Sequence, residues 1–298
     1  DVLIFDDCLM GSVEVATEFK DLALYAVVSE TVGWTSNHDY SAILSFLEAS
    51  PEIASSSAAL GMTDLMYLVD DETHVTQCVA TYDLQRMDAL LAALEAYLVD
   101  LAPYWQSDEG SMELARLYSE SLDIYYGNDG LDLYQFVLNT MFFYAEEELN
   151  ATGQEVLRML DPTSIGPVVL SKRATPVASF CHGMSAYFPR SAAVYNPSYG
   201  NSGSFSDISV WDSMVYTYLT YSAPLSLLFI EGSMGENDWF VSQVNATFLV
   251  YDPSSLGQGY LNYSFGELWY QYSGETLAMS EDGDHNLYYY ATGLNGEV

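Results

Sequence analysis

The residue best placed for chemistry is Cys8, which follows a short apolar segment and two acidic residues. Residues 2–5 are Val-Leu-Ile-Phe, and Asp6 and Asp7 separate them from the cysteine. A short continuous apolar run is typical of a buried strand, and catalytic groups of open α/β sheets gather at the carboxyl ends of such strands. Residues 12–20 then have the apolar spacing of a helix, so we expect the thiol at a strand-to-helix turn, where a helix N-terminus favours the nucleophilic thiolate. A lone cysteine after an apolar strand is also commonly a small buried hydrophobe, so this pattern alone leaves both interpretations open.

The neighbours of Cys8 form a motif that recurs in a known family. The sequence Phe5-Asp6-Asp7-Cys8-Leu9-Met10, followed by Val13-Glu14-Val15-Ala16-Thr17-Glu18-Phe19, is similar to D-A-C-L-M and E-V-A-Y-E-L of the clostripain-like cysteine peptidases. Four later segments resemble family motifs in the same order: Val28-Ser29-Glu30 with Gly33-Trp34 and Asp39-Tyr40, Thr81 to Asp88, Leu131 to Phe136, and Gly183 to Pro189. Five ordered segments are much harder to produce by chance than one.

The resemblance implies a fold and a reaction. The fold is the caspase-like three-layer α/β/α sandwich, incomplete at its N-terminus here, and the reaction is cleavage after Arg or Lys by a Cys/His dyad. Cys8 is then the nucleophile, and Asp6 matches the family aspartate that is expected to face the basic side chain of the substrate, with Asp39 as the weaker candidate. A carboxylate in a narrow pocket forms a charge-assisted hydrogen bond with a cation and is left unpaired by a neutral side chain. Asp7 stands where the family has a small residue, and it either points away from the site or disfavours the thiolate.

The dyad histidine is the part of the family pattern that this chain lacks. In the family it precedes the cysteine, on a His-Gly turn after an earlier strand, but only seven residues precede Cys8. We therefore expect the histidine in an upstream segment outside this chain, and we expect residues 1–298 alone to be inactive. The four histidines present are His38, His74, His182 and His285. His182 before Gly183 keeps a second interpretation open, as does His38 in a loop, but the G-M-S-A-Y-F-P match favours a structural role for His182.

The net charge of the chain limits the kinds of molecule that it can bind. The chain has 7 Lys plus Arg against 42 Asp plus Glu, a formal net charge of -35, because basic residues are rare rather than because acids are abundant. Three interpretations remain: adaptation to salt, a peptidase that keeps Arg and Lys out of its own loops, and a negative surface that attracts cationic substrates. The charge disfavours nucleic acid as a partner. Peptides or proteins with Arg or Lys are the expected substrates.

Cysteine and metal patterns indicate no required cofactor. Cys78 and Cys181 lie in apolar runs and are expected to be buried thiols rather than a bridge. No Cys/His spacing suggests zinc. The acidic turn at residues 281–284 lacks the full spacing of a calcium loop, although the resemblance leaves calcium open.

Three Asn-X-Ser/Thr triplets suit an exported protein; they begin at Asn150, Asn245 and Asn262. Together with the habit of the family, they place the protein outside the cell or at its surface as an expectation. No apolar stretch is long enough to span a bilayer.

The pattern of elements predicts two domains. Residues 1–223 form a peptidase domain, in which strands alternate with helices at 41–49, 83–102, 111–122 and 131–148, which predicts a parallel sheet with helices on both faces. Residues 224–298 have period-two strands rich in aromatic residues, which predicts a small antiparallel β domain. Two functions follow: a cysteine endopeptidase of which this chain carries the nucleophile, or a catalytically inactive peptidase-like surface protein whose β domain serves as a binding module.

Overall fold

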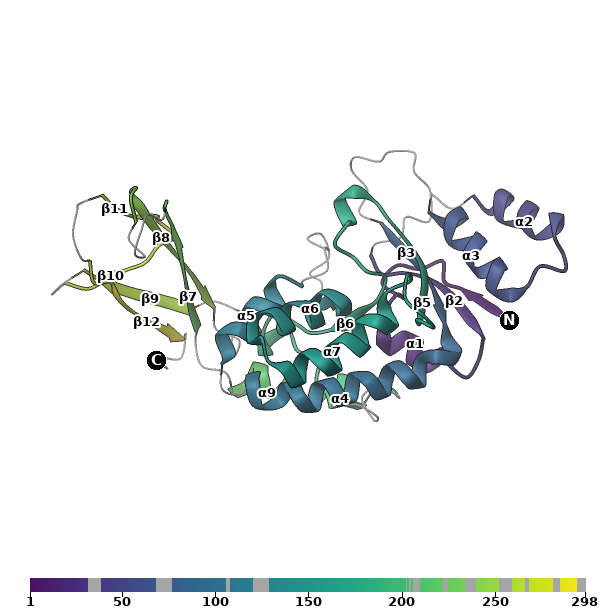
Figure 1. Cartoon of the computed structure of the whole chain (residues 1–298), viewed down its shortest axis with the longest axis horizontal. Helices are drawn as coiled ribbons and strands as arrows, with labels where there is room; N and C mark the ends of the chain where they lie inside the picture. Colours follow the sequence, from purple (N-terminus) through teal and green to yellow (C-terminus); the bar gives the residue numbers. More distant parts are fainter. Residues whose placement is uncertain are drawn as a thin grey trace. The chain divides into compact units, whose positions relative to one another are not determined.

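A computed structural model describes most of the chain. The described residues are 1–31, 39–67, 77–105, 108–119, 129–201, 203, 205, 210–221, 225–233, 240–251, 259–265, 268–280 and 285–293. They divide into two compact units, one made of residues 1–189 and 196–214, the other of residues 190–195 and 215–298. Figure 1 labels the elements of both units. The predicted boundary between residues 223 and 224 falls at residues outside the described ranges and stays a prediction.

The first unit is built on a four-stranded sheet. Its order is β1-β2-β3-β5, with β1 at Val2–Ile4, β2 at Tyr25–Ser29, β3 at Cys78–Asp83 and β5 at Val169–Ala174. Only β1 and β2 are parallel, whereas β3 is antiparallel to both β2 and β5. The prediction of a parallel sheet is therefore wrong for this part of the chain. A strand buried on both faces lacks a regular alternation of apolar and polar residues whichever way it runs, so the sequence of β3 did not reveal its direction.

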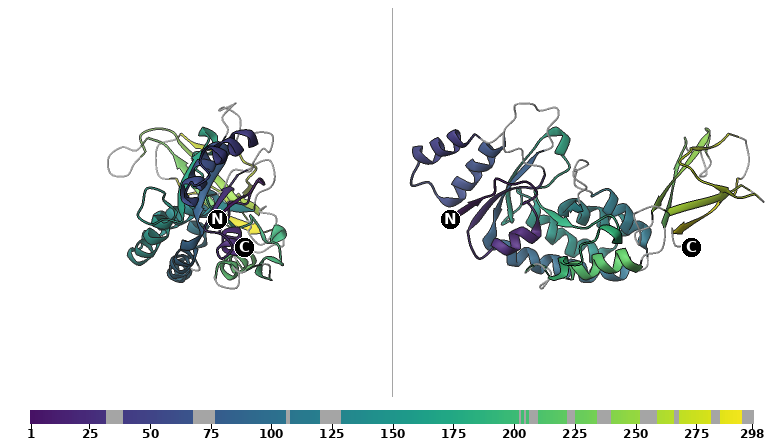
Figure 2. Two further views of the ribbon diagram at one scale, coloured as in Figure 1. Left: turned by 90° about the vertical axis from the view of Figure 1, so that its right-hand side faces the viewer. Right: turned by 180° about the vertical axis from the view of Figure 1, so that it is seen from behind.

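One face of this sheet is covered by α2 (Tyr40–Ala49) and α3 (Ser55–Met66), which Figures 1 and 2 show together on one side. Helix α3 contacts all four strands. The core of this layer is formed by Val27, Ile43, Ala59, Met62, Met66 and Val79. Because side chains alternate along a strand, the neighbours of Val79 in β3 point to the opposite face.

The opposite face of the sheet is covered by the chain around Gly183. The Tyr82 hydroxyl donates a hydrogen bond to the carbonyl of Gly183. Gly183 has a φ of +100°, and a Cβ there would lie 2.9 Å from the Cβ of Ala80, so glycine is required both by the backbone and by the close contact. This segment leads into β6 (Ser185–Tyr187), which is antiparallel to β4 (Gly130–Asp132).

The unit also contains α4 (Met87–Trp105), α5 (Glu109–Leu117), α6 (Leu133–Tyr144) and α7 (Glu147–Leu160). Helix α4 packs on α7, and α6 contacts both α5 and α7. The leucines at helical spacing in α4 are buried. The single helix predicted at 131–148 is wrong. Strand β4 occupies its start, and α6 ends at Tyr144, where the C-cap residue Ala145 has a left-handed φ of +54° before α7 begins. The short helix α1 (Val13–Phe19) follows Cys8, and α9 (Trp211–Tyr221) belongs to both units. Single 3-10 turns lie at Leu84–Arg86, Pro176–Ala178, Ala192–Val194 and Tyr199–Asn201.

The second unit contains two three-stranded antiparallel sheets, which confirms the predicted β module. One has the order β11-β8-β7 (Leu277–Met279, Val244–Tyr251, Leu225–Glu231), and the other has the order β10-β9-β12 (Tyr270–Gln271, Gly259–Ser264, Tyr288–Gly293). Ala246, Phe248, Leu261 and Leu277 form their buried core. Several aromatic side chains remain exposed, including Trp269 and Tyr290, whose rings contact each other.

Candidate active site

Cys8 lies in an exposed loop directly after β1, at the carboxyl end of that strand. The loop is anchored on both sides to β2, because Phe5 N donates to Val27 O at 3.0 Å and Gly11 N donates to Ser29 O at 2.8 Å. A Cβ at Gly11 would lie 2.6 Å from the backbone nitrogen of Glu30, so the close approach of the loop to this backbone requires glycine. Leu9 adopts a left-handed φ of +63° within the turn.

The other two cysteines are buried. Cys78 and Cys181 are both 0% exposed and pack with Ala178 in a small apolar cluster, as predicted from their sequence context. The proximity of Cys78, together with burial, raises the pKa of the Cys181 thiol. A thiolate nucleophile must be accessible to its substrate. Of the three cysteines, only Cys8 is exposed.

Asp6 and the start of helix α2 come together in the structure. Asp6 is exposed, and its carboxylate accepts a hydrogen bond from the Tyr40 hydroxyl, which raises the pKa of Tyr40. Asp39 is also exposed and caps α2, since its Oδ1 accepts a hydrogen bond from Ala42 N at 2.9 Å. The fold therefore brings Asp6, in the Cys8 loop, next to the start of α2, where Asp39 lies. The Asp39 carboxylate already serves as the N-cap of that helix.

His182 is held by an acidic and an aromatic neighbour. Its backbone N–H and its Nδ1 lie 2.5 Å and 3.1 Å from the carboxylate oxygens of Asp132, and its ring stacks on Tyr134 at 4.2 Å. Asp132 is buried and also caps α6, because its Oδ1 accepts a hydrogen bond from Gln135 N at 2.7 Å. These contacts agree with a structural histidine. His285 is exposed in the second unit, while His38 and His74 lie outside the described residues.

Glu30 is a buried carboxyl group that we did not predict as functional from the sequence. It is 1% exposed, follows β2, and accepts a hydrogen bond from Gly183 N at 2.7 Å. Burial, and then the nearby Asp132 carboxylate, raise the pKa of Glu30 well above its ordinary value. The sequence signal that could have identified Glu30 is its place directly after a run of strand residues that are buried. Such a position rarely tolerates an unpaired charge.

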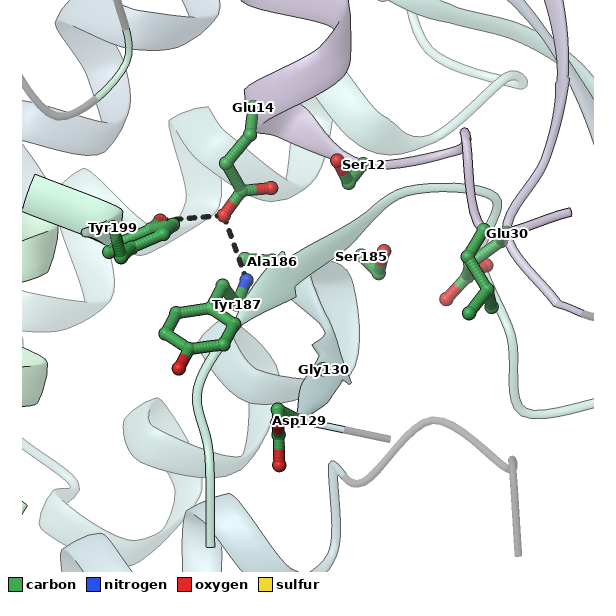
Figure 3. Close-up of a pocket in the computed structure, with 10 residues that line it drawn as sticks. Ser12, Glu14, Glu30, Asp129, Gly130, Ser185, Ala186, Tyr187 and Tyr199 are labelled. Atoms are coloured by element: carbon green, nitrogen blue, oxygen red, sulfur yellow. Dashed lines mark hydrogen bonds between the residues drawn. The ribbon is translucent and has the colours of Figure 1, made fainter. Parts of the chain in front are cut away.

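A cavity of about 410 Å³ lies beside the Cys8 loop, between the start of α1 and β6. It is lined by Leu9, Ser12, Glu14, Glu30, Asp129, Gly130, Ser185, Ala186, Tyr187 and Tyr199. Figure 3 shows Glu14 and Glu30 on different sides of this space, with Ser12 and Ser185 between them. No cluster of three His, Cys, Asp or Glu side chains among the described residues could hold a metal ion. The predicted acidic turn at 281–284 lies outside the described residues.

The clostripain family of peptidases matches residues 1–223 of this chain. The chain belongs to the clostripain family. No curated protein matches it. The match over the segment from β1 through α9 agrees with the resemblance noted in the Cys8 motif and the four later segments.

Several solved protease structures are similar to this chain at low sequence identity. A secreted cysteine protease from Bacteroides thetaiotaomicron, in complex with an irreversible peptide inhibitor, is 16% identical with a TM-score of 0.50, covering 71% of this chain and 59% of that chain. A cysteine protease from B. fragilis is 16% identical with a TM-score of 0.49, covering 72% of this chain and 89% of that chain. A clostripain from B. thetaiotaomicron, in complex with a peptide inhibitor, is 17% identical with a TM-score of 0.45, covering 70% and 86%. The family match and the structure with a TM-score of 0.50 support a clostripain-like, caspase-like α/β/α sandwich for the first unit, and the chain continues into an antiparallel β module.

No helix in the part of the chain that the structure describes is long and apolar enough to cross a membrane.

Proposed function

We propose that this chain is the nucleophile-bearing part of a cysteine endopeptidase that cleaves after Arg or Lys. The observation that carries the proposal is that only one of the three cysteines in this clostripain-family chain is exposed. Cys8 is exposed at the carboxyl end of β1, in the family's nucleophile motif, whereas Cys78 and Cys181 are buried. A nucleophile must reach its substrate, so Cys8 is the residue that attacks the scissile carbonyl.

The proton transfers belong to a histidine in an upstream segment outside this chain. The Cys8 thiol gives its proton to this base, the thiolate attacks the carbonyl carbon, and the same histidine then protonates the leaving amine. The contacts of His182 support this assignment, because Asp132 and Tyr134 engage its backbone and ring. The upstream segment is accordingly a partner that the active enzyme needs.

Asp6 is the proposed recognition group for the basic side chain. It is exposed, stands two residues before Cys8, and accepts a hydrogen bond from the Tyr40 hydroxyl that restricts its carboxylate. A carboxylate oriented in this way favours a guanidinium or ammonium group over a neutral side chain. Because the protease from B. thetaiotaomicron with a TM-score of 0.50 is described as secreted, and because the chain carries three glycosylation triplets, we also propose that it acts outside the cell or at its surface.

Active-site labelling tests the nucleophile and the specificity together. The complete protein is treated with matched acyloxymethyl ketones that present Arg, Lys or Leu, and the labelled cysteine is identified by mass spectrometry. We expect modification of Cys8 by the Arg or Lys reagent and none in Cys8→Ala. Equal labelling of Cys78 or Cys181, or equal rates with the Leu reagent, would contradict the proposal.

A second candidate is a catalytically inactive peptidase-like surface protein whose β domain binds a partner. The exposed aromatic side chains of the second unit favour it; they include Tyr260, Trp269, Tyr270, Tyr288 and Tyr290. The two candidates differ in the upstream sequence. A His-Gly turn after an apolar strand indicates the enzyme, and its replacement indicates the inactive relative.

A further inference from the structure

The cavity beside the Cys8 loop is lined by three acidic residues and no basic one. Glu14, Glu30 and Asp129 come from α1, the end of β2 and the residue before β4. Most described basic residues are engaged elsewhere by acidic side chains, as in Lys20–Asp88 and Arg173–Asp64. The cavity therefore has a negative potential that the chain does not neutralise within it.

One of these carboxyl groups has an oxygen without a hydrogen-bond partner. Glu30 is 1% exposed, and although its Oε2 accepts from Gly183 N, its Oε1 is buried without a partner among the described residues. A buried polar oxygen left unpaired is unfavourable, and such atoms are commonly satisfied by a ligand or a water molecule. The Asp132 side chain also interacts with this carboxyl group, and because Glu30 lines the wall of the cavity, a donor group of a ligand can reach it from that side (Figure 3).

The other side of the cavity is held in a fixed arrangement. Glu14 Oε1 accepts hydrogen bonds from Tyr187 N at 2.8 Å and from the Tyr199 hydroxyl at 2.7 Å. The rings of Tyr187 and Tyr199 lie 4.3 Å apart beside it. A carboxylate fixed next to aromatic rings is a suitable environment for an organic cation, which gains both a charge-assisted hydrogen bond and contact with a π face.

We propose that this cavity binds a second basic side chain of the peptide substrate, a Lys or Arg separate from the one that faces Asp6. The place of Leu9 in its wall, one residue after Cys8, puts the cavity within reach of a peptide bound at the nucleophile. Its volume of about 410 Å³ suits one long side chain. The peptide part of this assignment rests on the proposed peptidase function, whereas the cation site does not require Cys8 to react.

Binding is coupled to a proton. Burial and the nearby Asp132 raise the pKa of Glu30 in the folded chain, whereas a cation beside it favours the carboxylate. The other titratable groups that interact with it are Cys78, Cys181 and Tyr82. All four neighbours are neutral or negative, so a bound cation is the feature that displaces the proton. Binding should therefore release a proton and tighten as the pH rises.

Calorimetric titration of the 298-residue chain with n-butylamine tests the cation site without any catalysis, with n-butanol as the uncharged control. We expect weak binding of n-butylammonium only, with proton release detected as a difference between two buffers of unlike ionisation enthalpy. Glu30→Gln should abolish the proton release, and Glu14→Gln, at a partly exposed position that does not threaten folding, should weaken binding by roughly tenfold. Because n-butylammonium can also bind at Asp6, the variants are compared in an Asp6→Asn background. Asp21→Asn removes an exposed carboxylate that does not line the cavity, so it serves as the control and should leave binding unchanged. Equal binding with and without Glu14→Gln in that background would overturn the site.

Kinetics of the complete protein then test the substrate assignment. Peptides with two basic residues should lose roughly tenfold more kcat/KM in Glu14→Gln than peptides with one. Equal losses would overturn the second-side-chain assignment. An absence of turnover in wild type would instead count against the proposed function and leave the n-butylamine result intact, so the two failures are distinguishable.

Discussion

Two carboxyl groups flank the Cys8 loop in opposite environments. Asp6 is exposed and bonded to the Tyr40 hydroxyl, whereas Glu30 is enclosed beneath the loop and bonded to Gly183 N. The exposed group is available to a ligand at once, but water competes for it. The buried group has lost that water and responds strongly to any charge placed beside it. The comparison teaches that an acidic residue in this chain acquires its role from its surroundings rather than from its type.

Loss of the proposed catalytic base has the largest expected effect. We expect residues 1–298 alone to show no turnover of Arg or Lys peptides, because the base is proposed to lie upstream, and activity should return when the upstream segment is supplied. Rates are compared by fluorogenic peptide assay with and without that segment. Robust cleavage by the chain alone, abolished by His182→Ala, would place the base at His182 instead.

Neutralising the exposed carboxylate comes next. Asp6→Asn in the complete protein should lower kcat/KM for Arg peptides by roughly ten- to several-hundred-fold while Leu peptides change little, because only the cation loses a charge-assisted hydrogen bond. Asp7→Asn is the matched neighbour and should have a smaller effect. An unchanged preference for Arg over Leu would move the specificity carboxylate elsewhere, with Asp39 tested next by the same substitution.

Neutralising the buried Glu30 should alter the stability of the fold. It should not alter the preference for the basic substrate side chain that faces Asp6. The pKa of Glu30 is raised in the folded state, so folding retains a proton that the unfolded chain releases above the ordinary glutamate pKa of 4.5. The stabilising contribution is complete below that pH and is lost as the pH rises toward the raised value. Glu30→Gln should therefore flatten the fall of the free energy of unfolding with pH, as measured by urea denaturation from acid to neutral pH. Parallel pH profiles for the two proteins would contradict this.

The smallest effect is expected from the partner of Asp6. Tyr40→Phe removes one hydroxyl from an exposed hydrogen bond, so kcat/KM for Arg peptides should fall by only about two- to fivefold. The same change should leave binding of n-butylamine to the Glu30 cavity unaffected, since Tyr40 does not line that cavity. A loss as large as that of Asp6→Asn would mean that Tyr40 contacts the substrate itself.

Local patterns allowed much of the fold to be predicted. The apolar spacing in α4, the period-two strands of the second unit, and the burial of Cys78 and Cys181 all depend on residues close together in the sequence. The strand before Cys8 was predicted for the same reason, and the exposed thiol lies at its end. Errors arose where the outcome depends on distant partners. The direction of β3 and the break at Ala145 are examples.

By itself, the sequence determined the family, the cysteine at the end of β1 and the scarcity of basic residues, because motifs, local periodicity and composition are properties of the chain alone. The tertiary structure decided which acidic residues meet. Glu30 and Asp132 are distant in sequence, yet Glu30 accepts from Gly183 N while Asp132 accepts from His182 N. Burial of Glu30 raises its pKa, and only the packing of β2 against the chain at 182–183 produces that burial. The cavity lined by Glu14 and Glu30 has the same origin, since its walls come from elements that only folding brings together.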